Sequence, residues 1–243
     1  MVDIHCHILP EFDDGASSPD EAIAMVHMAV DSGITSIVAT PHFPGKTDSL
    51  ERIPALLDRY EWLRRAVRSQ RLPLHIYPGA EILCLPDTLA LAKQHTLPTI
   101  GNTSYLLTEF FFDEPFDRMD RTLTALADSG YRPVIAHPER YHAIQSDPAR
   151  LRHWQDKGYV LQLNKGSILG AFGSGPEAAA ITALQMRAAH VIASDAHSAH
   201  RRTPHMGQLR MWLEDHCDPE YAHMLLTENP SRLLENRSPV SHL

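Results

Sequence analysis

Hydrophobic positions along the chain gather in short runs, and the stretches between these runs repeat with helical periodicity. This alternation is typical of an α/β fold, because short apolar runs form buried strands and the amphipathic stretches form covering helices. The expected strands are residues 2–8, 34–39, 74–77, 105–111, 133–136, 159–163 and 190–193. The expected helices are residues 19–31, 51–71, 87–94, 118–129, 148–157, 176–188, 206–216 and 220–226. Strands that alternate with helices predict a parallel sheet with right-handed crossovers.

Polar residues follow almost every expected strand, at its C-terminal end. In a (β/α) barrel these ends converge on one mouth, whereas an open doubly wound sheet uses only the ends near its switch point. The pattern therefore favours seven strands closed into a barrel. No low-complexity segment or compositional break marks a linker, so we expect residues 1–243 to form a single domain.

The polar residues at the strand ends form a set that suits metal binding. His5 and His7 alternate along the first expected strand, so their side chains point to the same face. The complete set of candidate ligands is His5, His7, Asp14, His42, Glu81, Glu109, His137, Asp195 and His197. Each alone could be a helix cap or a core group, but the set holds too many ligands for one ion. Nitrogen and carboxylate ligands without thiolates predict a site for Mn, Fe, Zn or Mg, in which a carboxylate such as Glu81 can bridge two ions.

Composition narrows the class of protein further. With 43% hydrophobic residues, the chain is expected to be globular, and its formal charge of −8 argues against binding a nucleic-acid backbone. No apolar run reaches membrane-spanning length, and no basic region with a following apolar stretch predicts secretion. Three scattered cysteines fit a reducing cytoplasm.

The cysteines also exclude one route to phosphate-ester hydrolysis, which uses a cysteine nucleophile in a Cys-x5-Arg motif. The residues six positions beyond the three cysteines are Phe12, Ala90 and His223, and none is arginine. The class of enzymes that uses this cysteine mechanism is therefore excluded.

A series of short motifs runs along the chain. In chain order they are Asp-Ile-His-Cys-His-Ile-Leu-Pro, Asp-Asp-Gly, Thr-Pro-His, Gly-Ala-Glu-Ile, Glu-Phe, Ala-His-Pro-Glu-Arg-Tyr, Asn-Lys-Gly-Ser and Ser-Asp-Ala-His. From residue 1 to about residue 236 the series resembles the PHP (polymerase and histidinol phosphatase) superfamily. Within it, the resemblance is to the bacterial manganese-dependent protein-tyrosine phosphatases of capsule and exopolysaccharide biosynthesis, the CpsB/YwqE type.

The resemblance implies a distorted seven-stranded (β/α) barrel of the PHP type with about three Mn²⁺ ions; Fe, Zn, Co or Mg are the alternatives. It implies one ion held by His5, His7, Glu81 and Asp195. It implies a second held by Glu81, Glu109 and His137, and a third held by Asp14, His42 and His197. Two arginines of the family contact the phosphate. The first of them matches Arg140. For the second, Arg202 is the best match, although Arg201 beside it leaves the register open.

The family function implied is hydrolysis of protein phosphotyrosine, on the tail of a partner tyrosine kinase of polysaccharide export. Two alternatives stay open, a small-molecule phosphatase such as histidinol-phosphate phosphatase and a catalytically silent metal protein that regulates a kinase. The sequence does not indicate the oligomeric state. Phe110, Phe111, Phe112 and Phe116 could line the mouth, although aromatic runs near a strand end are more often core, and Lys165 receives no functional interpretation.

Overall fold

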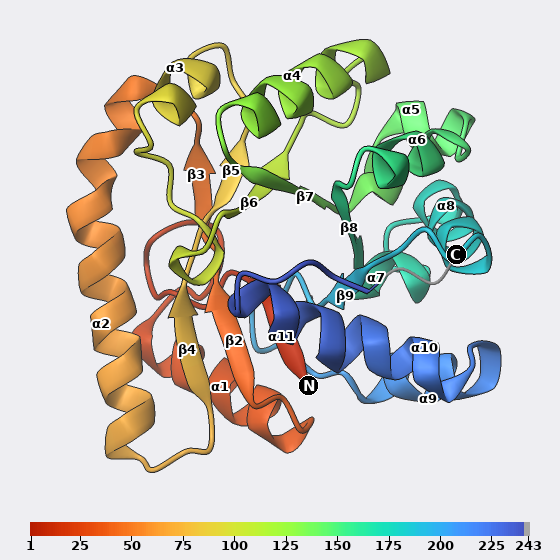
Figure 1. The fold of residues 1–243 in the computed structure, drawn as a ribbon. Helices are drawn as coiled ribbons and strands as arrows, with labels where there is room; N and C mark the ends of the chain where they lie inside the picture. The colour runs from red at the N-terminus through yellow and green to blue at the C-terminus, as the bar shows by residue number, and fades with distance from the viewer. Residues whose placement is uncertain (241–243) are drawn as a thin grey trace.

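The computed structural model describes residues 1–240 and has an α/β fold with two parallel sheets (Figure 1). One sheet has three strands, in the order β1 (Val2–Cys6), β2 (Ser36–Ala39) and β4 (His75–Pro78). The other has six, in the order β3 (His42–Pro44), β5 (Glu81–Leu83), β6 (Tyr105–Glu109), β7 (Arg132–Ala136), β8 (Val160–Asn164) and β9 (Val191–Ala193). All neighbouring strands pair in parallel, as the sequence predicts.

Two short strands, β3 and β5, were not predicted, and they bring the count to nine within residues 1–240. The chain passes from the first sheet to the second at Pro41 and again at Gly79. Pro41 has no N–H to continue the ladder, while its carbonyl accepts a bond of 3.0 Å from the Glu81 N–H. A Cβ on Gly79 would lie 2.7 Å from Val38 Cγ1, so the close crossing of the two segments requires glycine there.

The two sheets approach each other at β1 and the end of β9. The Asp195 N–H donates to the His5 carbonyl at 2.9 Å, and the His7 N–H donates to the Ala196 carbonyl at 2.8 Å. These bonds lie beyond the end of β9 and form only an isolated bridge, between Cys6 and Ala196. The closed seven-stranded barrel expected from the sequence is therefore not confirmed among the described residues, although the parallel α/β architecture is.

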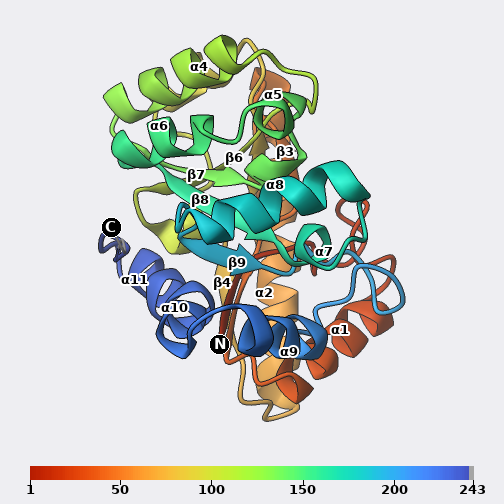
Figure 2. The ribbon, with the colours of Figure 1, turned by 90° about the vertical axis from the view of Figure 1, so that its right-hand side faces the viewer.

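Helices cover the outer faces of both sheets (Figures 1 and 2). They are α1 (Pro19–Asp31), α2 (Ile53–Ser69), α3 (Thr88–Lys93), α4 (Phe116–Asp128), α5 (His142–Ser146), α6 (Arg150–Asp156), α7 (Lys165–Ile168), α8 (Ser174–Gln185), α9 (Gly207–His216), α10 (Pro219–His223) and α11 (Asn229–Leu234). Short 3₁₀ helices span Thr47–Arg52, Ile100–Asn102 and Pro138–Arg140, and a π-helical turn spans Met224–Glu228. No helix of residues 1–240 combines the length and apolar character needed to cross a membrane.

Most predicted helices are present with shifted ends. α1 begins after Ser18, whose side chain accepts from the Glu21 N–H, as the Ser-Pro-Asp-Glu sequence predicts. The stretch predicted as one helix over 51–71 starts instead as the 3₁₀ helix and becomes α2 at Ile53, just before Pro54. Helices α5, α7 and α11 were missed because they are too short to show a period in the sequence.

Alternate residues of the strands fill the interior beneath the mouth. Tyr105 and Leu107 of β6 and Val191 and Ala193 of β9 belong to one buried apolar cluster. Since alternate positions of a strand share a face, the buried face of β6 continues to Glu109 at its C-terminal end. Asp195 lies two residues beyond β9, where its φ of +48° turns the chain out of the strand.

Candidate metal centre

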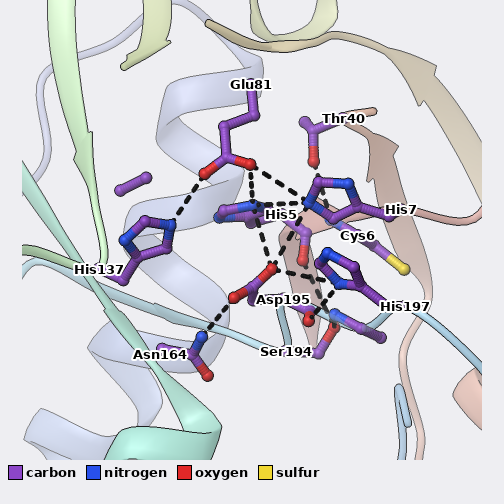
Figure 3. Close-up of polar contacts among 12 residues, drawn as sticks. His5, Cys6, His7, Thr40, Glu81, His137, Asn164, Ser194, Asp195 and His197 are labelled. Carbon is purple, nitrogen blue, oxygen red and sulfur yellow. Dashed lines mark hydrogen bonds and ion pairs between the residues drawn. The ribbon is translucent and has the colours of Figure 1, made fainter. Parts of the chain in front are cut away.

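Four fully buried side chains meet where the two sheets approach each other, and we call them the floor: His5, His7, Glu81 and Asp195 (Figure 3). The Nε2 atoms of the two histidines lie 3.1 Å apart. Glu81 Oε2 lies 3.3 Å from each of them, and Asp195 Oδ1 lies 3.4 and 3.5 Å away. Two nitrogens and two carboxylate oxygens thus converge on one point that is buried from solvent.

The floor histidines are oriented by hydrogen bonds on their other ring nitrogens. His5 Nδ1 bonds Gln162 Oε1 at 2.8 Å, and His7 Nδ1 bonds Asp13 Oδ2 at 2.7 Å. With Nδ1 as the donor in each ring, Nε2 keeps its lone pair for a cation, which is the arrangement typical of metal-binding histidines. Neither partner was predicted as a site residue. Asp13 lies within the Asp-Asp-Gly motif directly before Asp14, and Gln162 lies two residues before Asn164, on the same face of β8.

Glu81 joins the floor to a second group of ligands. Its Oε1 lies 2.9 Å from His137 Nε2, and its Oε2 lies 3.0 Å from His42 Nδ1. Glu109 lies 3.6 Å from each of these two histidines. Glu81 Oε2 is buried and faces imidazole nitrogens of His5, His7 and His42 at 3.0–3.3 Å, but none of these contacts among the described residues has hydrogen-bond geometry. This oxygen therefore fits a cation shared with those nitrogens.

A third group lies nearer the surface, around Asp14. Asp14 Oδ1 is 3.5 Å from His42 Nε2 and 3.6 Å from His197 Nε2. The ring of His197 packs against that of His7 with centroids 3.8 Å apart, which links this group to the floor. Asp14 itself is 66% exposed, whereas the floor is closed to solvent.

All nine predicted ligands therefore lie at one site, and several overlapping sets of them are compact enough to hold an ion. The sets are His7, Asp14, His42 and His197; His5, His7 and Glu81; His5, His137 and Asp195; and His42, Glu81 and Glu109. Their boundaries differ from the predicted three sets, because His42 faces both Asp14 and Glu81. The donor chemistry fits divalent cations that prefer nitrogen and oxygen.

Electrostatics at the floor favour positive charge. Burial lowers the pKa of His5, but the Glu81 and Asp195 carboxylates outweigh it and raise that pKa to about 9. Burial raises the pKa of Glu81, yet the surrounding histidines hold it well below its ordinary value. Burial and the nearby Glu81 carboxylate together raise the pKa of Glu109 to about 7. The carboxylates thus stabilise positive charge at the site. Bound metal ions or protons on the histidines can supply that charge.

Two arginines, which we call the rim, lie beside the floor: Arg140 and Arg202. Arg202 Nη2 donates to Asp195 Oδ2 at 2.5 Å, and Arg140 Nη1 lies 3.6 Å from the same oxygen. Asn164 Nδ2 also donates to this oxygen, at 2.5 Å. Arg201, the other candidate in the sequence, is exposed, and its carbonyl accepts a bond from Ser198. The structure thus brings Arg202 rather than Arg201 to the floor.

Lys165, for which the sequence predicted no role, lies beside the loop that carries Arg202. Its side chain is largely buried, and Nζ donates to the backbone carbonyls of Thr203 and, at 3.1 Å, of His205. These carbonyls belong to the loop that carries Arg202, and the Arg202 carbonyl in turn accepts from the His197 N–H at 2.8 Å. Lys165 therefore links the loop that carries Arg202 to the C-terminal end of β8.

None of the three cysteines takes part in these contacts. Cys6 and Cys84 are buried and Cys217 is partly buried, all as free thiols. The sulfur of Cys6 points away from the floor (Figure 3). Burial raises the pKa of the Cys6 thiol well above its ordinary value, so this thiol stays protonated and is a poor nucleophile.

The chain is similar in sequence to a known protein family and to several tyrosine-protein phosphatases. The family model described as "Capsular polysaccharide synthesis, CpsB/CapC" matches residues 1–235. The tyrosine-protein phosphatase YwqE of Bacillus subtilis is 36% identical over 238 residues, 98% of this chain and 93% of that protein. The tyrosine-protein phosphatase CpsB of Streptococcus pneumoniae is 29% identical over 240 residues, 96% of this chain and 98% of that protein.

Solved structures give the same result. A structure described as YwqE from Bacillus subtilis and CpsB from Streptococcus pneumoniae, "unique metal-dependent tyrosine phosphatases", superposes with a TM-score of 0.88 at 33% identity, covering 100% of this chain and 97% of the other. A putative histidinol phosphatase from Listeria monocytogenes shares the fold alone, with a TM-score of 0.52 at 13% identity over 89% of this chain and 100% of the other. The chain therefore belongs to the CpsB/CapC family of capsular polysaccharide synthesis proteins.

Proposed function

We propose that this protein is a metal-dependent phosphomonoesterase that hydrolyses phosphotyrosine in a protein substrate. The observation that carries the proposal is the combination of a buried nitrogen and carboxylate floor with two arginines at its edge, in a family whose similar members are named tyrosine-protein phosphatases. A phosphate dianion needs positive charge around its oxygens and an activated nucleophile.

Each group of the site has a part in this reaction. Divalent ions held at the site supply Lewis acidity and lower the pKa of water. Arg140 and Arg202 present planar guanidinium groups to the phosphate oxygens, which suit bidentate contacts. Asp195 holds both arginines at the edge of the floor, and Asp13 and Gln162 keep the two histidines in the tautomer that leaves Nε2 free.

We assign the resident metal as Mn²⁺, about three ions per chain, with Fe, Zn, Co or Mg as the alternatives. The first ion would use the floor, the second Glu81, Glu109 and His137, and the third Asp14, His42 and His197. The overlap of the compact ligand sets at His42 and Glu81 supports a multinuclear centre, because shared carboxylates bring ions together.

We further propose that residues 1–243 form one domain, a distorted seven-stranded barrel of the PHP type in the cytoplasm. The backbone bonds between β1 and the end of β9 support the barrel, and three free thiols support the compartment. The substrate would be the tyrosine-bearing tail of a partner kinase that controls capsule or exopolysaccharide synthesis.

The test is turnover of a phosphotyrosine peptide compared with histidinol phosphate, by protein purified without chelator and measured by elemental analysis. We expect more than one transition-metal ion per chain, preference for the peptide, loss of activity with chelator and recovery with Mn²⁺. Preference for histidinol phosphate would establish the small-molecule alternative. A fully metallated protein that hydrolyses neither substrate, nor a simple aryl phosphate, would establish the silent regulator.

A further inference from the structure

The guanidinium of Arg140 lies between two aromatic rings. Its Cζ is 4.3 Å from the ring centroid of Phe112 and 4.5 Å from that of Phe172. Phe112 lies in the loop after β6, and Phe172 lies in the loop between α7 and α8. Two segments distant in sequence thus contact one cation, and each contact is within the range of a favourable cation–π interaction.

The two rings hold Arg140 without using its hydrogen-bond donors. Among the described residues the guanidinium makes no hydrogen bond, and its only ionic partner is Asp195, at 3.6 Å. An arginine side chain is flexible, and ordering it normally costs conformational entropy or occupies its N–H groups. Contact through the rings restricts the plane of the guanidinium and leaves its N–H groups free for a ligand at its edge.

Both rings are themselves fixed by their surroundings. The Phe112 carbonyl accepts a bond of 2.8 Å from the His142 N–H, and its ring meets that of His137 edge-on at 6.1 Å. A Cβ at Gly166 would lie 2.6 Å from Phe172 Cε2, so the ring packs directly on the backbone of α7. Phe172 also lies 5.5 Å from Cζ of Arg202, which places one ring beside both residues of the rim.

We propose that Phe112 and Phe172 are positioning residues that hold Arg140 in the orientation needed to bind the phosphate group of the substrate. The proposal rests on the proposed function for the identity of the ester, and on the two ring contacts for the role of the residues. Phe112 contacts only Arg140 of the two arginines, so its removal should matter only while that guanidinium is present. Phe172 also lies beside Arg202, so a smaller part of its effect should persist without Arg140.

The experiment replaces each ring by leucine, in the native protein and in an Arg140→Ala background. In the native background, Phe112→Leu and Phe172→Leu should each lower kcat/KM on a phosphotyrosine peptide about threefold to tenfold, mainly through KM. Each should raise the inhibition constant of inorganic phosphate by a similar factor. Metal content should not change, because neither ring is a ligand.

Two controls separate positioning from packing. Phe112→Tyr and Phe172→Tyr keep the ring and should restore kcat/KM to within about twofold of the native value. Phe116, considered from the sequence as a possible residue of the mouth, instead stacks on Trp154 of α6 and lies 4.9 Å from Cζ of Arg150. This similar contact between α4 and α6 involves no residue of the floor or the rim. Phe116→Leu should therefore leave kcat/KM and phosphate inhibition unchanged.

The Arg140→Ala background gives the decisive result. If the rings position Arg140, Phe112→Leu should change kcat/KM by less than about twofold there, since interacting residues are not additive. Phe172→Leu should cause a smaller loss there than in the native protein, because only its contact with Arg202 remains. An equal loss in both backgrounds, or no loss in the native one, would overturn the proposal. A native protein that binds phosphate by calorimetry but hydrolyses no ester would refute the proposed function alone. The phosphate dissociation constants of the ring variants, in the native and Arg140→Ala backgrounds, would then test whether the rings position Arg140. Failure to bind phosphate at all would overturn both.

Discussion

The floor and the rim are adjacent, but they are built differently. The floor side chains are fully buried, and they project from strands or from strand ends that the core fixes. The rim residues are partly exposed: the side chain of Arg140 is 17% exposed and that of Arg202 is 32% exposed. Arg140 ends the short 3₁₀ helix after β7, and Arg202 comes from the loop after β9. Metal coordination demands fixed geometry, whereas phosphate binding demands donors that a substrate can reach. The difference predicts that floor substitutions remove metal and rim substitutions leave metal in place.

Glu81→Gln should have the largest effect, because this carboxylate faces His5, His7, His42 and His137 at once. Neutralising it removes a shared ligand and the negative charge that offsets several cationic groups. We expect loss of at least one ion by elemental analysis and a fall in kcat on the order of a thousandfold. Thermal unfolding in excess Mn²⁺ would show whether the variant is folded. A folded variant with the full metal content and near-native kcat would remove Glu81 from the centre.

Arg140→Ala tests the rim directly. We expect the metal content to be retained and kcat/KM to fall on the order of tenfold to a thousandfold, the effect typical of one preorganised donor. Arg140→Lys should recover little, since a point charge lacks the planar fork of guanidinium. His137→Ala, three residues earlier, should instead lose metal together with activity. Near-native kinetics in metallated Arg140→Ala would mean that Arg140 only pairs with Asp195.

Asp13→Asn probes the support of the floor rather than its ligands. Asp13 bonds His7 Nδ1 at 2.7 Å and accepts from the His42 N–H at 2.8 Å. Removing its charge weakens the preference for the His7 tautomer that exposes Nε2. Metal affinity should fall about tenfold to a hundredfold, as for other partners of metal-bound histidines. Competition with a fluorescent chelator measures this, and Asp20→Asn, in the first turn of α1, is the matched control.

The contrast between floor and rim also explains how much the sequence could predict. His5 and His7 were recognised because strand alternation alone places both side chains on one face, and the structure confirms that they meet. The parallel α/β arrangement was predictable from the alternation of apolar runs and helical periods, and it is confirmed. These signals are local, so a single sequence contains them.

Other features depend on contacts between distant segments and were missed. The chain passes from one sheet to the other at Pro41 and at Gly79, and the segments around these two residues lie against each other. No periodicity in the sequence shows that these segments are close in space. Gln162 orients His5 across 157 positions of sequence, and its only signal was the face that it shares with Asn164. Phe172 was not noticed at all, because a lone aromatic residue in a loop does not indicate which cation it will contact.

A smaller effect is expected for Lys165→Met, which keeps the length of the side chain but removes the bonds to Thr203 and His205. The loop that carries Arg202 loses its anchor, so KM for a phosphotyrosine peptide should rise about twofold to tenfold while metal content is unchanged. Lys157→Met is the control, because Lys157 pairs with Asp120 on the outer surface of the molecule. Equal effects of the two substitutions would show that Lys165 contributes only to stability.

The smallest effect should come from replacing all three cysteines. Alanine is the appropriate substitute, because Cys6 and Cys84 are buried and a serine hydroxyl there would need a partner. Burial raises the pKa of both thiols, and the Cys6 sulfur points away from the floor, so neither can supply a thiolate to phosphorus. The triple variant should keep kcat/KM within about twofold and lose about 1–2 kcal/mol of stability for each buried cysteine, because truncation leaves small cavities. If Cys6→Ala alone abolished hydrolysis in a folded protein with its full metal content, the floor and the rim would together be insufficient for the reaction, and a covalent cysteine mechanism would have to replace the metal-based one.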